Sequence, residues 1–184
     1  MIVLSQNCKI DSFFSFTYVI LCKVSLSAQR GSMTSKEYDP RMHSAEHILN
    51  QTMVRMFNRG RAFSSHLERK KSKCDYHFDR DVTPGEVHEI ESQVNSIIQS
   101  GAEVREEFLS REEAGKQFNL ARLPDEVGEN VRIIRIGDYD ACPCIGEHVR
   151  TTKEIGVFRV VSTSYENGAL RVRFKLSENA APGG

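Results

Sequence analysis

Two short motifs far apart in the sequence set the strongest constraint on how this chain can fold. His43 and His47 are separated by three residues within a predicted helix, so their imidazoles lie on the same face of that helix. Cys144 and His148 have the same spacing in a predicted loop. Three imidazoles and one thiolate form a donor set that suits zinc. The sequence therefore predicts one Zn²⁺ site, which requires the helix and the distant loop to meet.

The length of the chain favours one domain with terminal extensions. A chain of 184 residues can bury one substantial core but is short for two. We expect the folded domain over residues 33–178, a disordered or non-native extension over residues 1–32, and a frayed tail over residues 179–184. The apolar run at 13–22 is too short to cross a membrane and has little flanking positive charge. This favours a misplaced translation start or a cloning remnant over a signal peptide.

Composition excludes several classes of protein. The apolar content of 39% and charged content of 27% are typical of a globular domain, so no membrane partner is predicted. The formal net charge is zero, so any contact with nucleic acid depends on local patches. Five irregularly spaced cysteines do not resemble a secreted disulfide framework and favour the cytoplasm. The pair Cys142 and Cys144 leaves a thiol redox protein as an alternative.

One segment of the chain is strongly basic. A surface that follows RNA phosphates is one interpretation, and an ordinary solvated surface is the other. The candidate tRNA-binding residues in this segment are Arg59, Arg61, Arg69, Lys70 and Lys71.

Two long helices are predicted from apolar residues at helical spacing. The first begins at Asp39 and Pro40, an N-cap residue followed by proline, and is expected to end at Gly60. The second begins with a capping box at Thr83 and ends at Gly101. A shorter capped helix is expected from residue 110.

Alternating polar and bulky residues predict strands at 73–79, 104–109 and 131–136, and a hairpin of 156–162 with 169–176. These segments show no βαβ repeat and are joined by short turns. The predicted fold class is therefore α+β, with an antiparallel-dominated sheet packed by two long helices. The sequence has no glycine-rich phosphate loop, so a nucleotide-driven enzyme is not expected.

Five stretches occur in the order seen in a known family, and together they carry a resemblance: 43–50, 90–95, 131–138, 144–149 and 152–156. They resemble the editing domain shared by alanyl-tRNA and threonyl-tRNA synthetases, in the form called AlaX-type trans-editing proteins. The resemblance implies the zinc ligands His43, His47, Cys144 and His148. It also implies an ATP-independent hydrolase that cleaves the ester of mischarged tRNA, with serine or glycine on the alanine tRNA as its substrates. Ile145 and Glu147 stand where the family usually has glycine and threonine.

Several residues are candidates for the chemistry. Glu46 and His66 are candidates for activating water. A serine substrate requires a polar partner for its hydroxyl group, and the candidates are Ser44, Thr52, Ser64 and Ser65. Four protein ligands make a closed metal site, whereas catalysis favours an open position. The closed site favours one alternative, a non-catalytic RNA-binding domain stabilised by zinc. A second alternative, a deacylase of seryl-tRNA for threonine, remains because Ile145 and Glu147 differ from the family where the pocket is set.

Overall fold

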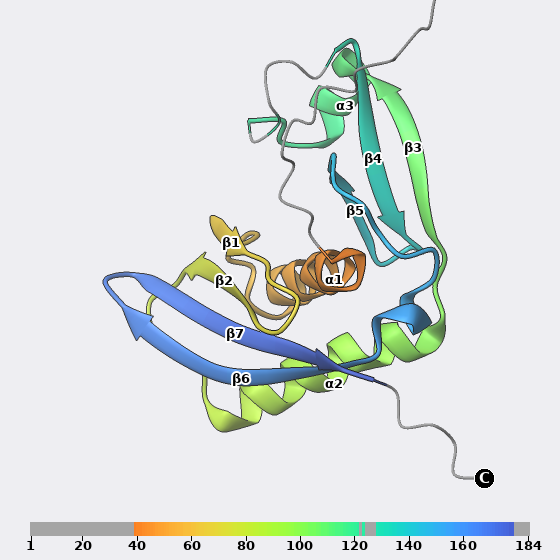
Figure 1. Ribbon diagram of the computed structural model, residues 1–184. Coiled ribbons are helices and arrows are strands. Elements are labelled where there is room, and N and C mark those ends of the chain that lie inside the picture. The colour runs from red at the N-terminus through yellow and green to blue at the C-terminus, as the bar shows by residue number, and fades with distance from the viewer. Residues whose placement is uncertain (1–38, 122, 124–127, 179–184) are drawn as a thin grey trace, which may run out of the picture. The chain divides into compact units, whose positions relative to one another are not determined.

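Seven strands form two antiparallel sheets in the part of the chain that the structure describes, residues 39–121, 123 and 128–178 (Figure 1). The structure is a computed structural model. The first sheet has the order β1 (Ser64–His66), β2 (Ser72–His77), β7 (Ala169–Ser177) and β6 (Val157–Glu166), and the second has the order β3 (Val104–Ser110), β4 (Asn130–Ile136) and β5 (Asp140–Pro143). The expectations for residues 1–32 and 179–184 lie outside the described residues.

The α+β class and the antiparallel pairing are confirmed, but the strands form two sheets instead of the expected one. Strands β1 and β5 were not predicted. β1 contains three exposed polar residues, and β5 has four residues, so neither shows an alternating pattern. The predicted hairpin is present as β6 and β7, and it turns at Asn167 and Gly168 with φ of 50° and 80°.

Both long helices begin where the sequence predicted. In α1 (Pro40–Phe57) the side chain of Asp39 accepts a hydrogen bond from the amide of Arg41 at 2.9 Å. The expected end at Gly60 is wrong, because Asn58 adopts the left-handed conformation at φ 52° and caps the helix. The second helix, α2 (Pro84–Ser100), has the predicted capping box at Thr83 and ends at Gly101. None of the described helices is long and apolar enough to cross a membrane.

A short helix α3 (Arg111–Gln117) follows β3, and a 3-10 helix η1 (Thr152–Ile155) precedes β6. Helix α3 packs on one face of the three-stranded sheet through a small core around Ala114, Val131 and Ile133. The larger core joins α1 and α2 to the four-stranded sheet, and its members include Ile48, Leu49, Ile90, Val94, Tyr76, Leu170, Val172 and Phe174.

Helix α1 positions the functional site. It packs on the four-stranded sheet through the large core, and it also contacts β5 of the three-stranded sheet (Figure 1). Side chains at the start of α1 can therefore reach the loop that follows β5.

Asn95 ties α2 to β6 through its side-chain amide. Its Nδ2 donates to the carbonyl of Phe158 at 2.9 Å, and its Oδ1 accepts from the amide of Phe158 at 2.9 Å. Phe158 is fully buried, so both backbone groups would lose their partner in an Asn95→Ala variant. We expect this variant to lower the free energy of unfolding by about 1–3 kcal/mol, measured by urea denaturation.

The neighbouring change Ser96→Ala is the matched control. Ser96 is exposed on the same helix, and its replacement should change stability by less than about 0.5 kcal/mol. Equal stability of the two variants would contradict a structural role for Asn95.

Candidate metal centre

The structure brings His43, His47, Cys144 and His148 into one cluster, in which the four potential ligand atoms lie within 4.8 Å of one another. The Cys144 Sγ is 3.4 Å from Nε2 of His43 and 3.4 Å from Nε2 of His148. Tetrahedral zinc with ordinary bond lengths would separate such ligand atoms by roughly 3.3–3.6 Å. The four side chains could therefore hold one metal ion, and their chemistry is compatible with zinc.

Close packing fixes the loop that carries Cys144 and His148. A Cβ atom on Gly146 would lie 2.2 Å from Cε1 of His43, so only glycine fits at this position. On the other side, Nη1 of Arg132 donates to the carbonyls of Cys144 and Gly146 at 3.0 and 2.7 Å. The loop is thus held between α1 and β4.

In two of the three imidazoles, hydrogen bonds determine which ring nitrogen carries the proton. Ser44 Oγ donates to the Pro40 carbonyl at 2.8 Å and lies 3.1 Å from Nδ1 of His148. Because the single hydroxyl proton is used on Pro40, Nδ1 of His148 must donate, which leaves Nε2 free to bind a cation. Nδ1 of His43 lies 3.2 Å from the carbonyl of Glu147, which can only accept, so Nδ1 carries the proton and Nε2 can serve as the metal-binding atom.

The third imidazole faces a buried carboxylate. Nδ1 of His47 lies 3.3 Å from Oδ2 of Asp140, an ionic contact whose geometry is too poor for a hydrogen bond. Arg61 binds the same carboxylate at 2.7 and 3.2 Å. Burial opposes charge on Asp140, but His47 and Arg61 hold its pKa below the usual range. Burial also opposes charge on His47, while Asp140 and Cys144 raise its pKa to about 9. A carboxylate behind a histidine is the arrangement that orients metal-binding imidazoles.

The two neighbouring thiols have opposite properties. Burial disfavours the thiolate of Cys144, but the imidazoles of His148, His43 and His47 that face it lower its pKa to about 3. Burial raises the pKa of Cys142 to about 11. Cys144 is therefore a thiolate at neutral pH and suits metal binding, whereas Cys142 stays protonated.

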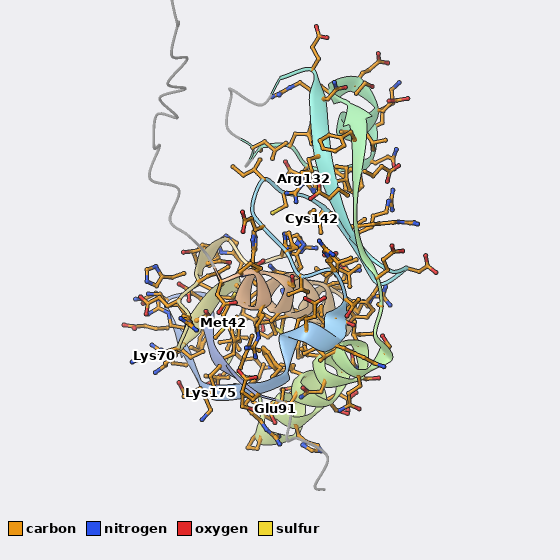
Figure 2. The ribbon with its side chains drawn as sticks, turned by 45° about the vertical axis from the view of Figure 1, so that its right-hand side comes forward. Met42, Lys70, Glu91, Arg132, Cys142 and Lys175 are labelled. Carbon is orange, nitrogen blue, oxygen red and sulfur yellow. The ribbon has the colours of Figure 1, made fainter. Side chains whose placement is uncertain are left out.

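A cavity of about 430 Å³ opens at the cluster. Figure 2 shows Arg132 and Cys142 on the three-stranded sheet, on neighbouring strands next to α1. The cavity is lined by residues of α1, of β5 and its following loop, and of the segments after α1 and α3: His43, Glu46, His47, Asn50, Arg61, Asn119, Leu123, Cys142, Pro143 and Cys144.

Glu46 is held in one orientation at this cavity. Its Oε1 accepts hydrogen bonds from Nδ2 of Asn50 at 2.6 Å and from Oγ of Ser65 at 2.8 Å. Asn50 is itself fixed, because its Oδ1 accepts from the amide of Ala62 at 2.8 Å. An oriented carboxylate beside a cation site can accept a proton from a bound water.

The other predicted residues lie in different surroundings. His66 is exposed on β1, where its Nε2 contacts Glu68 at 2.7 Å, and it is not among the described residues that line the cavity. Thr52 is fully buried and bonds the carbonyl of Ile48 and the hydroxyl of Tyr139, both at 2.8 Å. Ser44 is also fully buried, behind His148.

Ser64 and Ser65 are adjacent on β1, but only Ser65 contacts a residue that lines the cavity. The five basic candidates separate in space. Arg61 binds Asp140 and Arg59 binds Asp79, while Arg69, Lys70 and Lys71 are exposed in the connection between β1 and β2.

Sequence reasoning did not assign roles to Asp140, Arg132, Asn50 or Asn119. Asp140 directly follows a turn that contains Asp138, and the pattern does not tell which of the two side chains enters the core. Arg132 is an alternating polar position of a strand, which normally predicts a solvent-facing side chain. Its contacts depend on a loop that returns from β5, and no local signal indicates that return.

Comparisons with known proteins give a consistent result. Residues 131–173 match the family described as the threonyl and alanyl tRNA synthetase second additional domain. The chain is 34% identical to the alanine–tRNA ligase of Coxiella burnetii over 125 residues, which are 67% of this chain and 14% of the ligase. It is 31% identical to the alanine–tRNA ligase of Fervidobacterium nodosum over 132 residues, 71% of this chain and 15% of the ligase. The chain therefore spans only a small part of the relatives it matches.

The two cavity thiols should differ in reactivity with pH. At pH 5 we expect iodoacetamide to alkylate Cys144 of the metal-free protein and to leave Cys142 unmodified, because only a thiolate reacts. Labelling of Cys144 should disappear as the pH falls toward 3, and labelling of Cys142 should appear as the pH rises toward 11.

Peptide mapping by mass spectrometry measures both rates in one sample. Both thiols line the same cavity, so the comparison separates protonation from access. Equal labelling of Cys142 and Cys144 at pH 5 would show that the imidazoles do not stabilise the Cys144 thiolate.

Proposed function

Because the chain belongs to the threonyl and alanyl tRNA synthetase second additional domain family, which is an editing family, we propose that it is an aminoacyl-tRNA deacylase. It hydrolyses the ester that joins a wrong amino acid to the 3′ end of tRNA. The proposed substrates are seryl-tRNA and glycyl-tRNA for alanine, in the cytoplasm. The observation that carries this proposal is the oriented carboxylate of Glu46 in the same cavity as the cluster of three imidazoles and a thiolate.

We propose zinc as the resident metal, held by His43, His47, Cys144 and His148. The donor set fits zinc, and the hydrogen bonds of His43 and His148 leave their Nε2 atoms unprotonated for a cation. Zinc bound there would act as a Lewis acid toward the ester carbonyl.

The protein groups supply the proton transfers. Glu46, fixed by Asn50 and Ser65, accepts a proton from a water molecule as the water oxygen attacks the ester carbonyl carbon. The bond between that carbon and the ribose oxygen then breaks. The proton passes from Glu46 to the ribose oxygen, so the products are the free amino acid and tRNA with an intact hydroxyl. Water is the only co-reactant.

Discrimination of the amino acid is assigned to polar groups near Glu46. Of the four hydroxyl candidates from the sequence, Ser65 is the one that contacts a residue of the described cavity lining. Its oxygen can accept a hydrogen bond from the hydroxyl of a serine substrate, which alanine lacks. Ile145 and Glu147 flank Gly146 and have exposed side chains. They stand where the family usually has glycine and threonine. Both lie beside the described cavity lining and not within it, so we propose that they influence which substrate approaches the cluster.

The proposal is tested by incubating the protein with tRNA for alanine charged with serine, glycine or alanine, and with tRNA for threonine charged with serine. We expect release of serine and glycine from the alanine tRNA and retention of alanine. Glu46→Gln should slow release by roughly 10²–10⁴-fold, because the general base is lost. Glu112→Gln, at an exposed position of helix α3, is the matched control and should keep the rate.

Other outcomes of this assay have defined meanings. Release only from the threonine tRNA would show that the substrate is seryl-tRNA for threonine, the alternative considered above. Loss of activity in His66→Ala, with activity kept in Glu46→Gln, would assign the base to His66 instead. No release from any charged tRNA by a folded protein with metal would leave the non-catalytic RNA-binding domain as the function.

Asp140 should control the affinity for zinc through His47. We expect Asp140→Asn to weaken zinc binding by about 10–100-fold, because the uncharged amide stabilises the metal-bound imidazole less. Competition with a chromophoric chelator measures this affinity. Asp138→Asn is the matched control, since Asp138 is exposed in the same turn. Similar zinc affinities for the two variants would contradict the role of Asp140.

A further inference from the structure

One face of the four-stranded sheet carries basic side chains at alternating positions. On β2 and β7, the buried residues Cys74, Val172 and Phe174 belong to the large core. Lys73 and Arg173 alternate with them and therefore lie on the opposite face. Both long helices pack in the large core, so no described helix covers this opposite face.

Two of these cations are direct neighbours. Lys73 and Arg173 are register partners on adjacent strands, an arrangement that repels and destabilises the sheet. The next pair along the strands has complementary charges, since Arg171 binds both oxygens of Asp75 at 2.7 and 2.8 Å. Within the described ranges, Lys73 and Arg173 have no ion pair with a carboxylate, and Arg173 bonds only the hydroxyl of Ser164, at 3.3 Å. Lys73 and Arg173 attract the nearby carboxylate of Asp75, but that carboxylate is already bound by Arg171, so the face keeps an excess of positive charge that suits an external anion.

The basic surface extends beyond this pair. Ser72 is the register partner of Phe174, so Lys71 and Lys175 lie at the same end of the sheet. Figure 2 shows Lys70 and Lys175 on the same side of the molecule, at the four-stranded sheet. We define the basic sheet face as Lys71, Lys73, Arg173 and Lys175 at the sheet, together with Arg69 and Lys70 of the exposed connection that leads into β2.

The basic sheet face begins beside the cavity. Edge strand β1 carries both surfaces, because Ser65 turns toward Glu46 at the cavity while the next residue, His66, points to the other face of the strand. His66 is the register partner of Lys73. A polyanion lying on the basic sheet face can therefore continue past β1 to the cavity mouth.

We infer that the basic sheet face binds the phosphate backbone of the tRNA whose 3′ end enters the cavity, an assignment that rests on the proposed function for the identity of the RNA. The chain has no net charge, so phosphate binding must come from a local surface of this kind. The proposed binding surface is thus this face of the sheet, and no longer the continuous basic segment of the sequence. It adds Lys73, Arg173 and Lys175, and it excludes Arg59 and Arg61, which are engaged by Asp79 and Asp140.

The test measures binding of uncharged alanine tRNA by fluorescence anisotropy over a range of salt concentrations. The double variant Lys73→Ala with Arg173→Ala should raise the Kd by roughly tenfold or more and reduce the slope of log K against log salt by about 1.5. Lys175→Ala should act in the same direction with about half the effect on the slope. The control is Lys116→Ala with Arg150→Ala, which removes the same charge from exposed positions elsewhere and should leave the slope unchanged.

The double variant should have a urea midpoint no lower than that of the wild type, because the pair it removes is repulsive. An unchanged Kd and slope in the double variant would overturn the inference, and so would an equal loss in the control. Uncharged tRNA is not hydrolysed, so these readings do not depend on catalysis. A protein that binds tRNA through this face but releases no amino acid would refute the proposed function and keep the binding surface.

Discussion

The buried contact between His47 and Asp140 joins the two halves of this molecule. His47 belongs to α1, which packs on the four-stranded sheet, and Asp140 opens β5 of the three-stranded sheet. Arg61, from the segment after α1, adds a second link to the same carboxylate. Losing one partner of a buried charge pair costs about 3–5 kcal/mol, because the other charge remains without compensation. The loop that carries Cys144 and His148, here called the ligand loop, is positioned against α1 by this contact. The cavity between them therefore depends on it as well.

The same contact connects stability to chemistry. Asp140 fixes the orientation of His47, while Ser44 and the Glu147 carbonyl fix the other two imidazoles. Each histidine is thus supported from behind by a different kind of group: a carboxylate, a hydroxyl and a backbone carbonyl. The three imidazoles in turn keep Cys144 as a thiolate, whereas burial keeps Cys142, in the same cavity, as a thiol. The thiol redox alternative required both cysteines to be reactive, and their different surroundings do not favour it.

The features that the sequence predicted correctly depend on residues close together in the chain. The starts of α1 and α2, the hairpin turn at Asn167 and the grouping of His43 with His47 each follow from neighbours a few residues away. What it missed depends on distant partners. Asp140 acts through a contact between the two halves, and Arg132 acts through carbonyls of the loop that returns from β5. Arg61 was assigned to phosphate because it lies in a basic stretch of the sequence, whereas its partner in the structure is the distant carboxylate of Asp140. The division of strands into two sheets was missed because β1 and β5 are too short to show a pattern.

The ligand loop separates what must stay fixed from what can change. Gly146 touches the ring of His43 so closely that no side chain can replace its hydrogen, and Arg132 binds the carbonyls of Cys144 and Gly146. Ile145 and Glu147 are the immediate neighbours of this glycine, yet both are exposed, and Glu147 uses only its carbonyl to support His43. Substitutions at these two positions can therefore vary the exposed surface beside the donor cluster while the cluster itself is inherited intact. Under the proposed function, this is where substrate preference can diverge without rebuilding the centre.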